Sequence, residues 1–338
     1  MSRTVTSRRS FLHAGAGASL AALAHAVIAG TSSASETGLP TRVLGATGVR
    51  VSILCLGGWH VGAIKDDSES IRLMHAAIDE GMTFFDNSWD YHDGRSEEVM
   101  GRALEMDGKR QKVFLMTKCC GRDYAEAMKH LEDSLRRLRT DRIDLWQFHE
   151  IVYDNDPDWI FDKGAIRAAE EARKQGKVRF IGFTGHRDPR IHLKMLGKPF
   201  AWDTAQMPIN LMDAHYRSFQ NEVVPVCLQK NVGVVGMKGL AGGFPGGTLV
   251  SRAGLTPEEC YRYCLSLPVA TQVVGMLSME QFRQNVAISR GFRPMTGEEM
   301  AEARERVKTV AGDGRFELFK STNLFDGPVH RRQHGFAV

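Results

Sequence analysis

The feature of this sequence that most constrains its fold is a regular alternation of short apolar runs with amphipathic helical segments. Eight such pairs fit into about 250 residues, which is the count and spacing of a barrel built from alternating strands and helices. The predicted strands are residues 51–58, 83–86, 112–120, 143–150, 178–186, 203–210, 232–240 and 271–277. The chain is therefore predicted to be an α/β protein with a (β/α)8 TIM-barrel fold.

The predicted helices carry their own start and stop signals. The helix over residues 68–80 ends at Gly81, and the helix over residues 159–174 is closed by Gly176, since glycine is common just past a helix end. Residues 256–259, Thr-Pro-Glu-Glu, combine a capping box with a proline in the first turn, so a helix is predicted to begin there. The remaining helices are predicted to begin near Ser96, Tyr124, Pro189, Phe219, Met279 and Met295.

A doubly wound sheet is the alternative for a chain that alternates strands and helices. It would need a glycine fingerprint after the first strand and an acidic residue about twenty positions later. Gly57-Gly58 does not supply that fingerprint, and no internal repeat or interdomain linker is visible. We therefore predict one barrel domain over residues 35–338, with an irregular tail after Val310.

The composition is that of a soluble globular protein with a substantial core. Of the 338 residues, 43% are hydrophobic and 25% are charged. Lys and Arg number 44 against 40 Asp and Glu, a formal net charge of +4, and part of this excess lies in the N-terminal segment. No basic run interleaved with aromatic residues occurs, so no nucleic-acid partner is predicted.

The N-terminal segment has the features of a targeting signal. Residues 7–12, Ser-Arg-Arg-Ser-Phe-Leu, resemble a twin-arginine export signal, and a weakly apolar run from Ala14 to Gly30 follows. That run is too rich in Gly, Ala and His for a stable membrane span. We expect residues 1–34 to be a signal peptide recognised by the twin-arginine export machinery, cleaved after Ala34, so that the protein is exported to a bacterial periplasm. The alternative is a basic leader that stays attached.

Export would place the cysteines in an oxidising compartment, where disulfides form. Several of them lie in apolar strand-like runs, where free buried cysteine is common, so pairing stays open. No Cys/His spacing matches a zinc site or an iron–sulfur cluster, and no metal is predicted. His330 and His334 have the spacing of helical metal ligands, but without a third ligand a solvated tail is the expectation. The six cysteines are Cys55, Cys119, Cys120, Cys227, Cys260 and Cys264.

Four polar residues stand at or just after the ends of successive predicted strands. Asp86 ends the second strand, and Tyr91 lies on the loop that follows it. Lys118 and His149 stand near the ends of the third and fourth strands. In a barrel of this kind the C-terminal strand ends carry the chemistry. A carboxylate, a phenol, an ammonium and an imidazole gathered there could move a proton to or from a carbonyl oxygen.

This set, in this order and at these strand ends, resembles the aldo-keto reductase family over roughly Arg42 to Asn285. The resemblance implies that residues 41–51 form a small hairpin that plugs the bottom of the barrel. It also implies an enzyme that interconverts a carbonyl compound, such as an aldehyde, ketone or keto-sugar, and an alcohol. Because side chains cannot transfer hydride, a nicotinamide cofactor, NADP or NAD, would supply it.

In this interpretation Tyr91 is the general acid/base. A phenol titrates near 10 in water, and Lys118 beside it would favour the phenolate and lower its pKa. Asp86 would pair with Lys118, and a neutral His149 would donate a hydrogen bond to the carbonyl as negative charge develops there. The alternatives are a structural ion pair for Asp86 and Lys118, a rim aromatic for Tyr91, and a core histidine for His149.

The resemblance also implies the residues that bind the cofactor. Thr184 and Gly185 stand where the family usually has a Ser-Asn pair that grips the carboxamide, so a glycine replaces one amide side chain. Met237 stands where many members stack an aromatic ring on the nicotinamide, and a plain flexible loop is the alternative for residues 236–243. The implied cofactor-binding residues are Gly58, Trp59, Thr184, Gly185, Gln206, Met237, Lys238, Gly239, Leu240, Gly243, Gln281 and Asn285.

The choice between NADP and NAD stays open. Relatives that select NADP usually place cationic residues at the positions of Gly275 and Gln281, and both charges are missing here. A different class of function also stays open, namely a nucleotide-binding regulatory or sensor protein on the same barrel with little turnover. The oligomeric state and the substrate cannot be read, and the residues expected to line the substrate pocket are Trp59, His60, Trp89 and His92.

Overall fold

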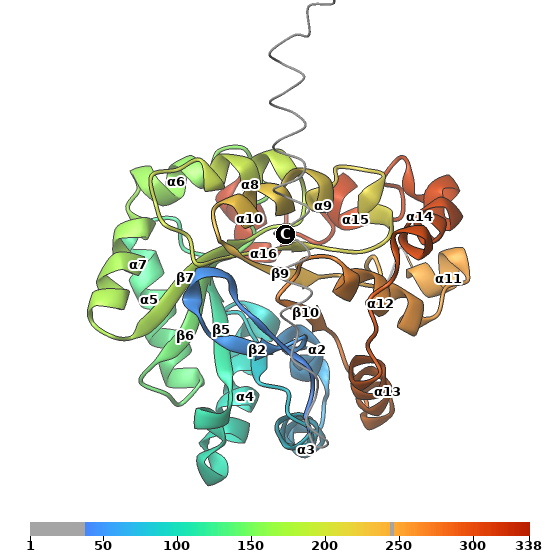
Figure 1. Cartoon of the computed structure of the whole chain (residues 1–338). Helices are drawn as coiled ribbons and strands as arrows, with labels where there is room; N and C mark the ends of the chain where they lie inside the picture. Colours follow the sequence, from blue (N-terminus) through green and yellow to red (C-terminus); the bar gives the residue numbers. More distant parts are fainter. Residues whose placement is uncertain (1–37, 244–246) are drawn as a thin grey trace, which may run out of the picture.

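The computed structural model describes residues 38–243 and 247–338, so the predicted signal peptide lies outside the described residues. Eight parallel strands form a closed barrel in the order β10-β3-β4-β5-β6-β7-β8-β9, which confirms the predicted fold. Figure 1 shows the helices arranged around the strands, with the N-terminal hairpin in front. The strands are β3 (Leu54–Gly57), β4 (Phe84–Asp86), β5 (Phe114–Cys119), β6 (Ile143–Phe148), β7 (Val178–Thr184), β8 (Thr204–Pro208), β9 (Gly233–Met237) and β10 (Thr271–Val274).

The helices follow the strands in the predicted alternation. Two of them begin with the capping contacts that their sequences indicate: Asp123 accepts from the backbone N–H of Glu126 in α5, and Thr256 and Glu259 form the predicted capping box of α12. The helices are α2 (Gly58–Ala63), α3 (Asp67–Asp79), α4 (Arg95–Glu105), α5 (Tyr124–Arg137), α6 (Asp156–Asp162), α7 (Ala165–Lys174), α8 (Pro189–Leu196), α9 (Phe219–Glu222), α10 (Val224–Gln229), α11 (Leu249–Ala253), α12 (Pro257–Ser266), α13 (Met279–Arg290) and α14 (Gly297–Ala311).

The strand register places the C-terminal strand ends on one rim of the barrel. Asp86 at the end of β4 is level with Met116 in β5, and Cys119 at the end of β5 is level with Phe148 at the end of β6. Residues that directly follow these strands therefore emerge close together. This rim is where the predicted catalytic residues should meet.

The opposite end of the barrel is closed by the predicted hairpin, β1 (Thr41–Val43) and β2 (Arg50–Ser52), which pair antiparallel. Arg42 is fully buried and donates hydrogen bonds to three backbone carbonyls between the end of α12 and β10. Gly45 has a φ of 50°, and a Cβ there would lie 2.3 Å from the backbone nitrogen of Gly233. Only glycine allows the hairpin to approach β9 this closely.

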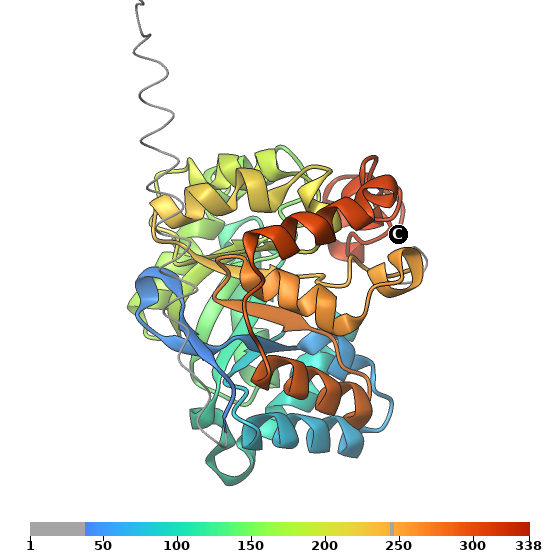
Figure 2. The same cartoon turned by 45° about the vertical axis from the view of Figure 1, so that its right-hand side comes forward.

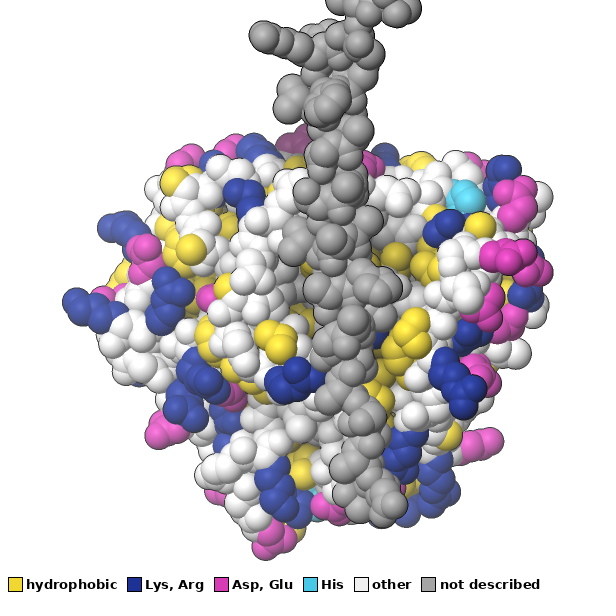
Figure 3. All heavy atoms as spheres, in the orientation of Figure 1, with side chains coloured by type: hydrophobic (Ala, Val, Ile, Leu, Met, Phe, Trp, Pro, Cys, Tyr) yellow, Lys and Arg dark blue, Asp and Glu magenta, His cyan; other side chains and the backbone are white. Residues whose placement is uncertain are grey.

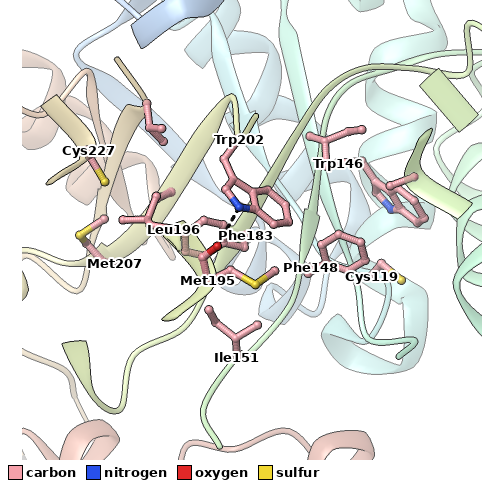
Figure 4. Close-up of a cluster of buried hydrophobic side chains, with 14 of the residues drawn as sticks. Cys119, Trp146, Phe148, Ile151, Phe183, Met195, Leu196, Trp202, Met207 and Cys227 are labelled. Atoms are coloured by element: carbon pink, nitrogen blue, oxygen red, sulfur yellow. Dashed lines mark hydrogen bonds between the residues drawn. The ribbon is translucent and has the colours of Figure 1, made fainter. Parts of the chain in front are cut away.

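Apolar side chains fill both the barrel and the layer between strands and helices. In the outer layer, Trp202 packs edge-on against Phe148 and Phe183, and its indole N–H donates to the Met195 carbonyl at 3.0 Å, so its polar atom is satisfied (Figure 4). The cluster at the hairpin end of the barrel comprises Leu44, Val51, Cys55, Phe84, Phe114, Met116, Leu145, Val235 and Ala270.

The tail after Val310 corrects the sequence analysis, which predicted an irregular, solvated segment. It contains α15 (Leu318–Ser321) and α16 (Pro328–Gln333), and its Lys320 and His330 are fully buried. Figure 2 shows the tail at the far end of the barrel from the hairpin. These helices are too short to carry a periodic apolar pattern, and they are held by ionic contacts that sequence spacing does not display.

The surface carries charges of both signs. On the face seen in Figure 3, Lys and Arg side chains are interspersed with Asp and Glu side chains around the edge of the molecule. Among the described residues, no helix combines the length and the apolar character needed to cross a membrane.

Candidate active site

The four residues predicted at strand ends meet at the C-terminal rim. Asp86 is the last residue of β4, and Lys118 is the penultimate residue of β5. His149 directly follows β6, and Tyr91 begins a short 3-10 turn that follows β4. Sequence order and strand register therefore bring the four side chains to one place.

The ammonium group of Lys118 is bound on three sides. It forms an ion pair with Asp86, donates to the backbone carbonyl of Asn87 at 2.7 Å, and donates to the Tyr91 hydroxyl oxygen at 3.1 Å. The side chains of Lys118 and Asp86 are only 1% and 4% exposed. These contacts use the three hydrogens of the ammonium. Because the Tyr91 oxygen accepts from Lys118, the phenolic hydrogen is free to be donated to another group.

The protonation of Tyr91 differs from the sequence-based expectation. Burial raises the pKa of Tyr91 well above its usual value, and the carboxylates of Asp86 and Asp90 raise it further. Lys118 was expected to lower this pKa, but Asp86 neutralises its charge at close range. Tyr91 therefore keeps its proton at neutral pH.

The loop that carries Tyr91 has a constrained backbone. His92 and Asp93 adopt left-handed conformations with φ of 52° and 55°, which are uncommon for residues with side chains. The Nε2 atom of His92 lies 2.7 Å from the carbonyl oxygen of Trp59, and the Trp59 ring meets the Tyr91 ring edge-on at 5.4 Å. These contacts fix the phenol against the start of α2.

His149 is held by a carboxylate that the sequence analysis missed. Its Nδ1 lies 3.0 Å from Asp90 Oδ1 and 3.1 Å from the hydroxyl of Ser88, which itself donates to Asp90 at 2.6 Å. Burial would raise the pKa of Asp90, but the His149 ring and its hydrogen bond hold that pKa below the usual range. A carboxylate only accepts, so Nδ1 carries a hydrogen.

This tautomer differs from the expected role of His149. A neutral ring with its hydrogen on Nδ1 has a lone pair on Nε2, which accepts a hydrogen bond and cannot donate one to a carbonyl. Donation from Nε2 requires either a protonated ring or a group that replaces the hydrogen on Nδ1. The residue spacing gave no indication of this, although Asp90 directly precedes Tyr91 in the chain.

Three further polar groups that the sequence analysis did not assign to the site surround His149. The Sγ of Cys120 lies 3.7 Å from His149 Nδ1, and the His330 ring lies 5.4 Å from the His149 ring. Glu150, next in the chain, accepts from the backbone N–H of Gly327 in the tail at 2.7 Å. Burial raises the pKa of Glu150 to about 7. Cys120 and Glu150 adjoin predicted strand ends, whereas His330 carries no such signal.

The segment predicted to face the cofactor after β3 lies against the catalytic group. Gly58 begins α2, and a Cβ there would lie 2.3 Å from the Asp86 carbonyl oxygen. Only glycine therefore fits between these strand ends. Trp59, the next residue, is half exposed beside Tyr91.

The predicted carboxamide contacts lie at the ends of β7 and β8. Thr184 pairs with Gln206 across these strands, and both side chains are buried. The Gln206 Oε1 atom is buried without a hydrogen-bond partner among the described residues. A Cβ at Gly185 would lie 2.4 Å from the carbonyl oxygen of Ile151, so the asparagine common in the family could not fit here unchanged.

The predicted pyrophosphate segment after β9 is shaped by its backbone and by the tail. Lys238 and Ala241 have φ of 56° and 57°, and the Ala241 N–H donates to the Lys238 carbonyl in a tight turn. The Lys238 ammonium lies 5.1 Å from the Phe319 ring and 5.0 Å from the Phe325 ring, both in the tail. Burial lowers the pKa of Lys238 to about 8. The other predicted residues of this segment are Met237, Gly239, Leu240 and Gly243.

The predicted adenosine end lies at β10 and α13. A Cβ at Gly275 would lie 2.2 Å from the ring of His60, so a cationic side chain there would displace that ring. Gln281 is exposed, and its side-chain oxygen accepts from the Leu277 N–H at 2.8 Å. Asn285 is buried on the same helix. No cationic residue occupies either of the two positions that bind a 2′-phosphate in NADP-selective relatives.

One expected pocket residue faces elsewhere. Trp89 stacks on His130 at 3.5 Å, and its indole nitrogen donates to Asp133 on α5 at 3.2 Å. It therefore packs on the outer helical layer, away from Tyr91. The Trp59 ring contacts the rings of Tyr91 and His92. That Trp59 and His92 line a substrate pocket stays a prediction.

The fold and the site together define a class: a closed parallel barrel with a buried Lys–Asp pair and a tyrosine at its C-terminal rim. Comparison with known proteins agrees. The model of the Aldo/keto reductase family matches residues 53–253. The uncharacterized oxidoreductase YrpG of Bacillus subtilis (strain 168) is 34% identical over 235 residues, which cover 62% of this chain and 70% of that protein.

Longer alignments lead to the same group. L-galactose dehydrogenase of Arabidopsis thaliana is 26% identical over 321 residues, covering 81% of this chain and 97% of that protein. The holo form of aldo-keto reductase AKR11C1 from Bacillus halodurans superposes with a TM-score of 0.67 at 25% identity, covering 79% of this chain and 96% of that one. This chain belongs to the aldo/keto reductase family. Family and fold support an oxidoreductase acting on carbonyl compounds or alcohols.

Proposed function

We propose that this protein is an NAD(P)(H)-dependent reductase of aldehydes, ketones or keto-sugars, or the matching alcohol dehydrogenase, with Tyr91 as its general acid/base. The observation that carries the proposal is the contact of Lys118 with the Tyr91 hydroxyl oxygen, backed by the buried Asp86 carboxylate. If Lys118 and Asp86 formed only a structural ion pair, Lys118 would not need the Tyr91 hydroxyl as a further partner. Tyr91 is also partly exposed at the barrel mouth, where a substrate could reach it.

The proton would travel through Tyr91. Its hydrogen is free because Lys118 occupies a lone pair on its oxygen, so the phenol can donate to a substrate oxygen. As the proton leaves, the Lys118 ammonium would stabilise the phenolate at 3.1 Å. Burial raises the pKa of Tyr91, so the phenol holds its proton at neutral pH until a substrate oxygen accepts it.

The residues at the rim fit a nicotinamide cofactor at most of the predicted positions. When bound, NADP or NAD supplies the hydride that side chains cannot. The buried Oε1 of Gln206, which has no partner among the described residues, would accept from the carboxamide. Thr184 would contact the same group, while Gly185 offers no side chain. Lys238, held beneath two tail rings, would face the pyrophosphate.

We further propose that residues 1–34 direct export through the twin-arginine pathway to the periplasm, and that residues 35–338 form the mature enzyme. The paired arginines Arg8 and Arg9 support this proposal. Because that pathway carries folded proteins, the cofactor would be exported bound and recycled by a second substrate. Protein purified from the periplasm should carry about one nucleotide per chain. Protein that is purified empty and binds nucleotide weakly would contradict the proposal that the cofactor is exported bound.

The test of the reaction is a substrate panel. Purified protein would be mixed with NADPH or NADH deuterated at the transferable position and with aldehydes, ketones and keto-sugars. Deuterium in an alcohol product is the expected result. Nucleotide binding without reduction of any member would instead favour a sensor on this barrel.

A further inference from the structure

We propose that Asp90, Cys120, His149 and His330 form a binding site for one divalent metal ion of the zinc type. Each residue offers one ligand atom, and the four atoms lie within 4.8 Å of one another. A carboxylate oxygen, a cysteine sulfur and two imidazole nitrogens are the donor types that zinc prefers.

The four ligands come from elements that converge at the barrel mouth. Asp90 lies on the loop after β4, Cys120 directly follows β5, and His149 directly follows β6. These three therefore follow the C-terminal ends of adjacent, hydrogen-bonded strands. The fourth, His330, is brought by α16 of the tail, which folds back over the rim.

Two interatomic distances in this cluster are close to those of a tetrahedral zinc site. Zinc–sulfur and zinc–nitrogen bonds of about 2.3 and 2.0–2.1 Å imply ligand–ligand distances of about 3.6 Å for S to N and about 3.3 Å for N to O. Cys120 Sγ lies 3.7 Å from His149 Nδ1, and His149 Nδ1 lies 3.0 Å from Asp90 Oδ1. The four ligand atoms all lie within 4.8 Å of one another, so any one pair would need to close by at most about 1.5 Å on metal binding.

A second observation points to a ligand here. His330 is fully buried, and its Nε2 has no hydrogen-bond partner among the described residues, since the Glu150 carboxylate lies 3.6 Å away. Its Nδ1 lies 3.4 Å from a guanidinium nitrogen of Arg122, which only donates, so the ring hydrogen is on Nε2. Metal binding at Nε2 would require that hydrogen to leave and Nδ1 to take one up, with Arg122 turning away. A buried polar atom without a partner is costly. Charge also balances: the Asp90 carboxylate and a Cys120 thiolate together match the two positive charges of the ion.

Metal binding would change the tautomer of His149, a consequence that rests on the proposed function. The ion would bind Nδ1 in place of its hydrogen, and the ring would take up one hydrogen on Nε2. Cys120 would release its thiol proton to solvent on becoming a thiolate. His149 would then present an N–H donor at Nε2, which the metal-free ring held by Asp90 does not.

The site can be tested on metal-free full-length protein without cofactor or substrate, so that the outcome is independent of the reaction. Zinc affinity would be measured by competition with a chelating dye, and Co²⁺ would serve as a spectroscopic probe. We expect one equivalent of either ion to bind, with a thiolate-to-cobalt charge-transfer band in the near ultraviolet. Absence of stoichiometric binding would overturn the proposal.

Substitutions identify the ligands. Cys120→Ser should abolish the charge-transfer band, and both Cys120→Ser and His330→Ala should weaken zinc binding by at least about a hundredfold. Matched controls are Cys119→Ser, adjacent in the chain, and His334→Ala, on the same tail segment but bonded to Asp156. Each control should bind as the parent does. Melting temperatures would establish that each variant folds. A folded Cys120→Ser that keeps the band or the affinity would overturn the proposal.

Discussion

The ammonium nitrogen of Lys118 lies 3.1 Å from the hydroxyl oxygen of Tyr91, although 27 positions separate the two residues in the chain. Asp86 and the Asn87 carbonyl hold the ammonium from the other side. The contact therefore places a fixed positive charge beside the phenol oxygen, as a site that stabilises developing charge requires. Its stability should depend on the buried Asp86 carboxylate.

Removal of that carboxylate should destabilise the fold. In Asp86→Asn the Lys118 ammonium stays buried without a counter-ion, and we expect a loss of about 3–5 kcal/mol in the free energy of unfolding, measured in urea. Adding Lys118→Met to Asp86→Asn should recover part of the loss. Glu305→Gln breaks an exposed ion pair and should change stability by less than about 0.5 kcal/mol. If Asp86→Asn lost less than about 0.5 kcal/mol as well, Asp86 would not be the counter-ion on which Lys118 depends.

The tail should lose stability as pH rises. Burial raises the pKa of Glu317 to about 7, whereas an unfolded glutamate titrates near 4.3. The native chain thus holds a proton that the unfolded chain releases, so the contribution is full below about pH 4.3 and is lost as pH rises through about 7. The contribution of Glu317 to the free energy of unfolding is on the order of 4 kcal/mol.

Glu317→Gln should remove this pH dependence. Urea unfolding at intervals between pH 5 and 8 should show a shallower fall in stability for Glu317→Gln than for the parent. The slope of Glu305→Gln, whose side chain is exposed, should match that of the parent. Equal slopes for all three proteins would show that Glu317 does not titrate as described.

Cofactor choice should respond to Gln281 and not to Gly275. The parent should bind NADP and NAD with affinities within about a hundredfold, because neither position carries a cation. Gln281→Arg should favour NADP by roughly fivefold, the value of an exposed ion pair near 1 kcal/mol. Gly275→Arg should destabilise the protein because its Cβ meets the His60 ring. Fluorescence titrations with both nucleotides would test the predicted cofactor choice. If the parent bound NADP more than about a hundredfold more tightly than NAD, the prediction would be contradicted.

The barrel and the positions of the four rim residues were predictable because both follow from strand periodicity. Once parallel strands are in register, residues at their C-terminal ends meet, whatever the sequence between them. Asp86 and Lys118 were therefore correctly expected to pair. The capping box at Thr256 and Glu259 is likewise a local pattern that the structure confirms.

Protonation states and the tail depend on long-range contacts and were not predictable. The pKa of Tyr91 rises because burial and the carboxylates of Asp86 and Asp90 outweigh Lys118, a balance that spacing does not contain. His330 lies 181 positions after His149 in the sequence, on a helix of six residues with no periodic signal. The expectation of a solvated His330 failed for that reason.

The central claim is that the Tyr91 hydroxyl transfers the proton, and Tyr91→Phe tests it most directly. Phenylalanine keeps the ring against Trp59 but removes the oxygen that Lys118 contacts. We predict that kcat for carbonyl reduction falls by about a thousandfold or more while the nucleotide dissociation constant changes by less than about threefold. A variant that retains more than about a tenth of the parent kcat would contradict the account.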